Sequence, residues 1–373
     1  MSKPRALRRM TIVGVFLDGR PEFELFGPIL LELAKRGRVM FRVFLTSGLA
    51  RREPDVVRLL KGCGIDPIIR PNKWMKSWLF YRRLVGTFDL LLTAGEPSRD
   101  ITSHGPRLRF LAKSGVPMFY FQHGVIQGGI NIATIEPPPW SFYACRIYLF
   151  QEPLANRALF SAGELPKIKI SGFLKQVLLP RKSPSNRASD LIKNRAGIIL
   201  ICHSFRWGGG RFSNEAMTKL SAMIRHAASE LPDYLFIVRP HRGKTRKVDR
   251  LFETELCDGF NNIVFARQHF GAFGGMSLSD LTVYCSAVIS TPSTALLDAA
   301  YDGCPVAVFN CDHEVFDDIP QVYSNADFVS FCQTPSTRGR DIIIERYGDI
   351  MENLNVVCSD IENYQSNEYY NCY

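Results

Sequence analysis

Short, continuously apolar segments alternate with amphipathic helical segments along most of this 373-residue chain. Thr11–Leu17 is almost wholly apolar, residues 25–36 carry apolar side chains at helical spacing, and residues 39–45 are apolar again except for Arg42. Strands that are apolar throughout are buried on both faces, as in a parallel sheet covered by helices on both sides. The alternation therefore predicts an α/β fold with doubly wound, Rossmann-like sheets.

The alternation runs to about residue 172, stops, and then starts again. The intervening stretch PRKSPSNRAS, residues 180–189, is polar and contains proline, which is typical of a linker. A chain of this length accommodates two domains. We predict one domain over residues 1–180 and a second over 181–373, the second including a C-terminal helix near 338–356 and a polar, tyrosine-rich tail expected to fray. The helix could also pack on the first half.

The charge of the chain is concentrated in its first half. Residues 1–180 hold 27 Lys and Arg against 13 Asp and Glu, a net charge of +14, whereas residues 181–373 have a net charge of −4. A basic surface fits an anionic partner such as nucleic acid, a phospholipid surface or a phosphorylated substrate, or is simply solvated. The basic residues are scattered and no aromatic-rich basic strand accompanies them, so we expect no nucleic acid.

Several absent signals narrow the class of protein. No apolar run approaches the ~18–20 residues that a membrane-spanning helix needs. The basic N-terminus and apolar residues 10–17 imitate a signal peptide, but Asp18, Arg20 and Glu22 follow at once. The ten cysteines form no CxxC pair, and there is no HExxH motif. We expect a cytoplasmic protein with reduced thiols and no bound metal.

The most informative motif is ISTPSTALLD, residues 289–298, where a predicted strand ends and a helix begins. Ser293 is a suitable N-cap, and free N–H groups at a helix start bind phosphate oxygens. Hydroxyl groups and a carboxylate one turn further on could bind phosphate and ribose. The candidates are Ser290, Thr291, Ser293, Thr294 and Asp298; the alternative is an ordinary capped helix.

Two other loops of the second half could bind phosphate. The strand at 234–238 leads into RPHRGK, in which Arg239, His241 and Arg242 offer positive charge to a pyrophosphate or a leaving group. The loop HSFRWGGGR contains Ser204, Gly208 and Gly209, and such a glycine-rich loop can surround a phosphate. A solvated basic loop and an ordinary flexible loop are the respective alternatives.

The first half offers two candidates for proton transfer. Gln122, His123 and Gly124 follow an apolar strand, and the imidazole of His123 could act as a general base, although a lone histidine is more often structural. Asp18 follows the first strand and could be a base, an orienting carboxylate or only a turn residue. These alternatives stay open at the level of sequence.

The order of these motifs resembles the GT-B class of glycosyltransferases. Within that class the chain is similar to CDP-glycerol glycerophosphotransferases of the teichoic-acid type and to capsule or Kdo transferases that use CMP-activated donors. The resemblance implies two Rossmann-like domains facing a cleft, with His123, Gln122 and Gly124 on the acceptor side. It also implies donor-phosphate contacts for His241, Ser293 and Thr294, and a ribose contact for Asp298. The chain departs from the pattern after His123, where a lysine is missing, and at Arg242, where proline is usual.

The resemblance implies metal-independent transfer of a glycosyl or polyol-phosphate group in bacterial cell-surface polysaccharide synthesis. The donor would be nucleotide-activated, of the CMP or CDP type, and is a substrate, so no cofactor is expected. The acceptor would be a lipid-linked molecule or a glycan, with the basic half in peripheral contact with the inner face of the plasma membrane. Two alternatives are a nucleotide-sugar 2-epimerase, which needs no acceptor, and a non-enzymatic protein that binds anions or nucleic acid.

Overall fold

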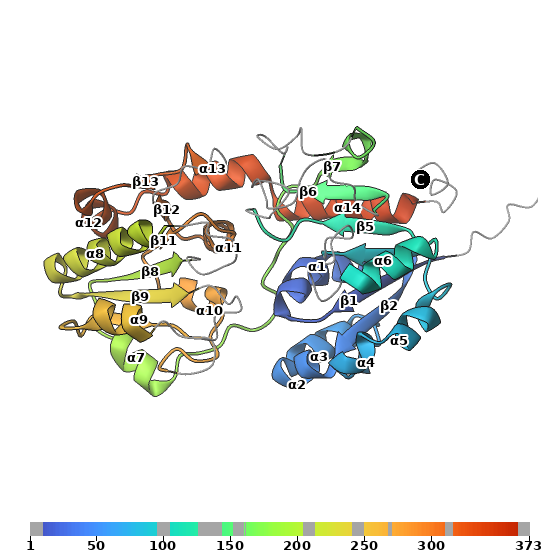
Figure 1. The fold of residues 1–373 in the computed structure, drawn as a ribbon, viewed down its shortest axis with the longest axis horizontal. Coiled ribbons are helices and arrows are strands. Elements are labelled where there is room, and N and C mark those ends of the chain that lie inside the picture. The colour runs from blue at the N-terminus through green and yellow to red at the C-terminus, as the bar shows by residue number, and fades with distance from the viewer. Residues whose placement is uncertain are drawn as a thin grey trace, which may run out of the picture. The chain divides into compact units, whose positions relative to one another are not determined.

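The chain folds into two compact α/β units, each with one parallel sheet (Figure 1). This computed structural model describes residues 10–94, 105–125, 144–151, 160, 162–203, 213–240, 250–267, 271–309 and 316–364. Within these ranges, unit 1 comprises the chain up to His123, the part before Arg181, and the segment from Tyr347 onward. Unit 2 comprises the part from Arg181 to Arg346 and the short segment that begins at Gly124. The predicted class of two Rossmann-like domains is confirmed.

The sheet of unit 1 has the strand order β3-β2-β1-β4-β5-β6-β7, and all its neighbouring strands pair in parallel. Its central strands are buried throughout, as their continuous apolar sequences predict. The strands are β1 (Thr11–Leu17), β2 (Val39–Thr46), β3 (Ile68–Arg70), β4 (Leu90–Thr93), β5 (Met118–Phe121), β6 (Arg146–Leu149) and β7 (Ile168–Ile170).

Helices with one apolar face cover the sheet of unit 1. The longest, α1 (Arg20–Arg36), begins earlier than its apolar pattern predicts, because Pro21 suits the first turn of a helix. It ends at Gly37, which has φ 65°. The others are α2 (Ser47–Arg52), α3 (Pro54–Gly62), α4 (Asn72–Met75), α5 (Trp78–Leu84), α6 (Gly105–Lys113) and α14 (Ile350–Asn363).

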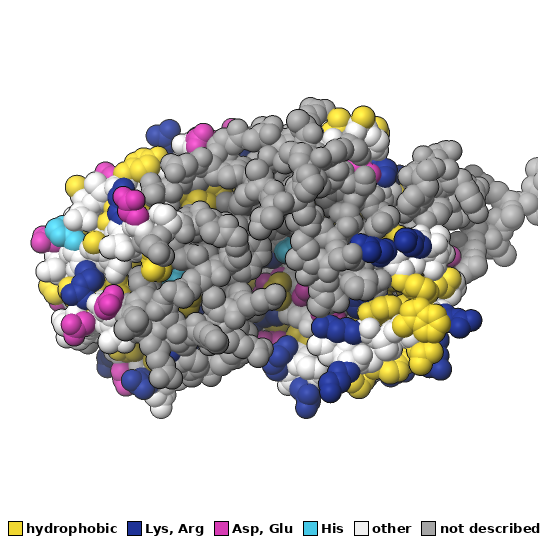
Figure 2. Space-filling model, viewed as in Figure 1, with side chains coloured by type: hydrophobic (Ala, Val, Ile, Leu, Met, Phe, Trp, Pro, Cys, Tyr) yellow, Lys and Arg dark blue, Asp and Glu magenta, His cyan; other side chains and the backbone are white. Residues whose placement is uncertain are grey.

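One core of unit 1 lies between the sheet and helices α4, α5 and α6. Phe80, Tyr81 and Leu84 of α5 pack there with Phe16 of β1 and Leu91 of β4. The side chains on the outer surface of these helices include a hydrophobic group bordered by Lys and Arg (Figure 2). The buried side chains of α5 therefore hold the helix on the sheet, and its exposed side chains are not part of this core.

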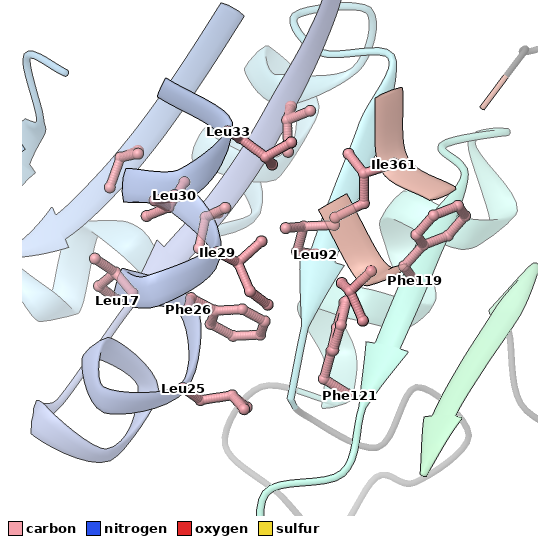
Figure 3. Close-up of a cluster of buried hydrophobic side chains, with 14 of the residues drawn as sticks. Leu17, Leu25, Phe26, Ile29, Leu30, Leu33, Leu92, Phe119, Phe121 and Ile361 are labelled. Atoms are coloured by element: carbon pink, nitrogen blue, oxygen red, sulfur yellow. The ribbon is translucent and has the colours of Figure 1, made fainter. Parts of the chain in front are cut away.

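The other core lies between the sheet and helices α1 and α14 (Figure 3). The rings of Phe26 from α1 and Phe121 from β5 meet edge to face at 5.6 Å between centroids. Leu354, Val357 and Ile361 of α14 are buried in the same cluster. The C-terminal helix therefore belongs to unit 1, and the prediction that placed all of residues 181–373 in the second domain is corrected for it.

The helix expected near 338–356 is in fact two helices. α13 (Arg338–Tyr347) and α14 are separated by Gly348, which has φ 74° and so ends the first helix. The chain is fixed here because Asn353 donates through Nδ2 to the carbonyl oxygens of Tyr347 and Phe173, at 2.7 and 3.1 Å. A glycine at position 348 was thus a boundary signal that the apolar periodicity on either side concealed.

The sheet of unit 2 has the order β10-β9-β8-β11-β12-β13, again with every neighbouring pair parallel. Its strands are β8 (Gly197–His203), β9 (Tyr234–Pro240), β10 (Ile263–Phe265), β11 (Ala287–Ser290), β12 (Val306–Phe309) and β13 (Gln321–Val322). Its further helices are α7 (Asn186–Ile192), α8 (Asn214–Glu230), α9 (Arg250–Cys257), α10 (Leu278–Thr282), α11 (Ala295–Tyr301) and α12 (Asn325–Gln333). The sequence pattern missed β13 and the helices α7, α9, α10 and α12.

The predicted linker is attached to unit 2. Arg181 forms an ion pair of 2.8 Å with Asp302, and the backbone N–H of Lys182 donates to Asp280 at 2.9 Å. Ser185 caps α7 and also donates to the carbonyl oxygen of Ala272. The polar residues that suggested a linker therefore satisfy hydrogen bonds on the second unit.

In each sheet the direction in which successive strands are added changes at one point. In unit 1 the connections run outward on either side of the β1 and β4 pair, and in unit 2 on either side of the β8 and β11 pair. In such open parallel sheets, ligands bind beyond the carboxyl ends of the strands at this switch point. We therefore expect a ligand site at the loops that follow β1, β4, β8 and β11.

Candidate functional site

The switch point of unit 2 brings three side chains into one row across the sheet. Arg239 of β9 is paired with Cys202 of β8, and Cys202 is paired with Ser290 of β11. Residues directly opposite on neighbouring strands point to the same face of a sheet, so the three share one face at its carboxyl edge. Burial raises the pKa of Cys202 to about 12, an effect that the charge of Arg239 opposes and that of Asp298 reinforces. Two of the predicted donor-site residues, Arg239 and Asp298, thus lie close to the same thiol.

Arg239 is held firmly in this row. Its side chain is 9% exposed, and its Nη1 donates to the carbonyl oxygen of Met276 at 3.2 Å. A buried guanidinium needs such partners, because an uncompensated charge in the interior is costly. Arg239 therefore offers a fixed positive charge at the carboxyl edge of the sheet, in the same row as Ser290.

The structure divides the predicted hydroxyl cluster after β11 into buried and accessible members. Ser290 and Thr291 are fully buried, and Ser290 Oγ lies 2.7 Å from the carbonyl oxygen of Thr291 and 3.1 Å from Ser293 Oγ. Ser293 and Thr294 are half-buried, so their hydroxyls can reach a ligand. Ser290 and Thr291 therefore maintain the shape of the loop, whereas Ser293 and Thr294 can contact a ligand.

The start of α11 differs from the expected one. Thr294, not Ser293, occupies the N-cap position, and the helix begins at Ala295 and has seven residues. Ser293 nevertheless accepts from the backbone N–H of Ala295 at 3.3 Å. Because the helix is this short, any anion here would depend on hydroxyl and backbone groups of the loop more than on a helix dipole.

Thr294 also holds the segment after His123. The backbone N–H of Val125 donates to Thr294 Oγ1 at 2.9 Å, within the part of the chain that groups with unit 2. Asp298 lies one helical turn beyond Thr294, and its backbone N–H donates to the Thr294 carbonyl oxygen at 3.0 Å. The half-buried carboxylate of Asp298 is thus on the same side of α11 as the accessible hydroxyls.

His203 is a residue of this edge that the sequence analysis did not select. It is the last residue of β8, half-buried, and paired with Pro240 of β9. Its position at the end of the strand next to β11 is the signal that could have identified it. The predicted residues Ser204, Gly208, Gly209, His241 and Arg242 follow these two strands and lie outside the described residues.

Unit 1 has a charged cluster at the carboxyl end of β1. Asp18 accepts from Arg107 Nη2 at 3.1 Å, and the two side chains are 14% and 5% exposed. The Arg107 guanidinium also lies over the Phe16 ring, 3.9 Å from its centroid. Asp18 is a residue predicted from the sequence, whereas Arg107 is not, because the two belong to segments far apart in the chain.

Two further titratable groups belong to this cluster. Burial raises the pKa of Glu22 above its ordinary value, and the negative charge of Asp18 adds to the effect. Burial also raises the pKa of Tyr81, with Arg107 opposing and Asp18 reinforcing the shift. A carboxyl group with a raised pKa beside a fixed carboxylate is an arrangement that suits proton transfer.

His123 and Gln122 follow β5 at the same edge of the sheet but differ in burial. Gln122 is 1% exposed, and its Oε1 accepts from the backbone N–H of Phe150 at 2.8 Å, so it joins the ends of β5 and β6. The His123 side chain reaches solvent. Lost hydration from the protein around it and the charge of Lys175 nevertheless lower its pKa, against a hydrogen bond with the backbone of Ala94. A neutral imidazole of this kind can accept a proton at neutral pH.

The part of the chain that the structure describes contains no group of three or more His, Cys, Asp or Glu side chains placed to hold a metal ion. It also contains no helix long and apolar enough to span a membrane.

Comparisons with known proteins give structural matches over almost the whole chain. A UDP-GlcNAc 2-epimerase from Neisseria meningitidis, bound to UDP-GlcNAc, has a TM-score of 0.59 and 16% identity, with 95% of this chain and 100% of that chain covered. S. aureus MnaA in complex with UDP has a TM-score of 0.63 and 13% identity, with 95% of this chain and 97% of that chain covered. A Methanocaldococcus jannaschii UDP-GlcNAc 2-epimerase in complex with UDP-GlcNAc and UDP has a TM-score of 0.56 and 13% identity, with 93% of this chain and 98% of that chain covered.

This chain has the GT-B fold. No protein-family description matches the sequence, and no curated protein matches it either. The fold expected from the resemblance is therefore confirmed, and the proteins that share it are enzymes of nucleotide-sugar chemistry.

The activity expected from the resemblance is corrected. We expected a glycosyl- or polyol-phosphate transferase, whereas the matched structures are UDP-GlcNAc 2-epimerases. They lend no support to a CDP-glycerol donor, a surface-polymer acceptor or a membrane contact. The short His-Gly and Pro-His motifs misled because they mark strand ends of the GT-B fold, which hosts more than one reaction.

Proposed function

We propose that this protein is a nucleotide-sugar 2-epimerase that inverts the configuration at carbon 2 of a UDP-linked N-acetylhexosamine. The observation that carries the proposal is the structural similarity, over nearly the full length of both chains, to UDP-GlcNAc 2-epimerases. The accessible hydroxyls at the switch point of unit 2 support it, because phosphate oxygens need such donors.

In unit 2 the nucleotide would bind at the carboxyl edge of β8 and β11. Ser293 and Thr294 would donate to phosphate oxygens, and Arg239 would supply positive charge at the same edge of the sheet. Asp298, one turn along α11, would accept from ribose hydroxyls. Ser290 and Thr291 would hold the loop in shape, since both are fully buried.

Inversion at carbon 2 breaks a C–H bond and forms one on the opposite face of the sugar. Because no carbonyl group adjoins carbon 2, the electron pair of the broken bond would form a double bond to carbon 1 and expel UDP, which would add back to carbon 1 as the proton returns to carbon 2 from the other face. The reaction needs no acceptor, but it needs groups that take up and return a proton. His123, with a lowered pKa, and Glu22, with a raised pKa, both follow carboxyl ends of strands in unit 1 and have the required properties. Asp18 is ion-paired with Arg107, so we assign it to fixing the charge of the cluster.

Incubation of the purified protein with UDP-GlcNAc alone in D2O tests the proposal. Proton NMR should show the C-2 epimer and deuterium at carbon 2, without an added acceptor. The double variant Ser293→Ala/Thr294→Ala should lower turnover by roughly 10²-fold. Ser330→Ala, which alters an exposed serine of α12, is the matched control and should leave turnover unchanged. No epimer and no deuterium exchange with UDP-linked sugars would contradict the proposal.

A further inference from the structure

The outer side of α5 and its neighbours carries a hydrophobic patch. Trp78 and Leu79, adjacent at the start of α5, are 56% and 61% exposed, and Val85 just after the helix is 40% exposed. Contiguous apolar surface of this kind on a folded protein marks a site of interaction.

These side chains take no part in holding α5 in place. The helix is anchored by Phe80, Tyr81 and Leu84, which are buried in the core beneath it, and by the cap at Ser77. Trp78 and Leu79 therefore face water without contributing to the fold, an unfavourable exposure unless a partner covers them.

Positive charge surrounds the patch. Arg70, Lys73, Lys76, Arg82 and Arg83 are all exposed, and the sequence has no Asp or Glu between Asp66 and Asp89. The Arg82 guanidinium lies over the Trp78 ring, 5.5 Å from its centroid. Figure 2 shows hydrophobic side chains with Lys and Arg around them over the region that Figure 1 labels α4 and α5.

We propose that this surface, the α5 face, binds the surface of an anionic phospholipid membrane. We define the α5 face by its exposed hydrophobic residues Trp78, Leu79 and Val85 and by the five cations around them. Aromatic and aliphatic side chains enter the boundary between headgroups and acyl chains, and surrounding Lys and Arg side chains meet the phosphates.

The charges of the α5 face argue against a second copy of this chain as its partner. A symmetric contact places the same surface patch on both subunits, so the five cations of one copy would meet the five of the other. A flat anionic surface satisfies both the cations and the apolar side chains at once. The inference is independent of the reaction proposed above, since it depends on unit 1 surface residues that the proposed site does not use.

Flotation with lipid vesicles tests the inference on the full-length protein. Vesicles of phosphatidylcholine with about one third phosphatidylglycerol should carry the protein, and vesicles of phosphatidylcholine alone should not. Raised salt should weaken binding, because the phosphates attract the cations through charge. Equal flotation with both kinds of vesicle, or none with either, would overturn the proposal.

Two double variants locate the contact. Trp78→Ser/Leu79→Ser should abolish flotation, and Arg82→Gln/Arg83→Gln should weaken it roughly 25-fold, at about five-fold for each cation removed. Val356→Ser, at a similarly exposed apolar residue of α14, and Arg187→Gln/Lys193→Gln, at two exposed cations of α7 and its C-cap, are the matched controls. Controls that lose flotation as much as the test variants would overturn the assignment to the α5 face.

Sedimentation of the same proteins without lipid tests the alternative partner, which is a second copy of this chain. A dimer that Trp78→Ser/Leu79→Ser converts to a monomer would show that the α5 face joins two copies and would overturn the lipid assignment. A mass that the variant leaves unchanged, together with loss of flotation, is the result we expect. Because the substituted side chains are exposed, each variant should keep the thermal stability of the wild type.

Discussion

Ser290 and Ser293 lie three residues apart with their hydroxyl oxygens 3.1 Å from each other, yet one is fully buried and the other accessible. The hydrogen bond between them connects the end of β11 to the loop that precedes α11. The inner serine thus determines where the outer one stands, and substitution of the two should give different results.

Substitution of each serine by alanine distinguishes a role in stabilising the loop, expected for Ser290, from a role in contacting the ligand, expected for Ser293. Ser290→Ala should reduce the stability of unit 2 by about 1–2 kcal/mol, because it leaves buried hydrogen-bond partners unsatisfied. Ser293→Ala should change stability little but weaken UDP binding roughly ten-fold. Thermal denaturation with and without UDP measures both quantities. The opposite pattern would show that Ser290, not Ser293, meets the ligand.

Glu22→Gln should alter how stability depends on pH. The raised pKa means that the folded protein holds this proton more tightly than the unfolded chain, whose pKa is near 4.5. The contribution of Glu22 is therefore fully present below that pH and is lost as pH rises through the folded-state pKa. Relative to wild type, the variant should gain stability between low pH and pH 7. Urea unfolding at several pH values tests this, with the exposed Glu230→Gln as control, which should show no such gain.

His123 should remain neutral under mildly acidic conditions. Because its folded-state pKa lies below the ordinary value of 6.5, the unfolded chain binds the proton more readily. Stability from His123 is thus present above pH 6.5 and decreases as pH falls toward the folded-state pKa. NMR titration of the imidazole measures the pKa directly, and His123→Gln should make stability less sensitive to acid in this range. An imidazole that titrates at or above 6.5 would contradict the assignment of His123 as a neutral proton acceptor.

Gly172 should be far less replaceable than Gly37, although their φ angles are 64° and 65°. An added Cβ at Gly172 would lie 2.3 Å from the carbonyl oxygen of Tyr347, whereas at Gly37 it would meet nothing within 4 Å. Gly37→Ala should cost about 1–2 kcal/mol for its backbone conformation. Gly172→Ala should cost at least about 1 kcal/mol more, because the segment leading into α14 must shift. Urea unfolding of both variants measures the difference, and equal costs would show that the chain at Tyr347 moves freely.

The sequence predicted the two parallel-sheet units well because their signal is local. A buried strand such as β4 needs apolar residues throughout, and a helix such as α8 needs them at intervals of three and four. The resemblance in short motifs was a poorer guide to the reaction. His123 follows β5 and Ser293 follows β11, and such positions alone do not specify a reaction, because one fold hosts several.

Sequence alone thus determined the fold class, the strand ends and the candidate polar residues, since each depends on neighbours along the chain. Tertiary structure decided which of those residues are accessible, that Arg239 and Ser290 flank Cys202, that Arg107 pairs with Asp18, and that α14 completes unit 1. These relations join segments far apart in sequence. They depend on strand register and on how whole faces pack, and no local pattern encodes either.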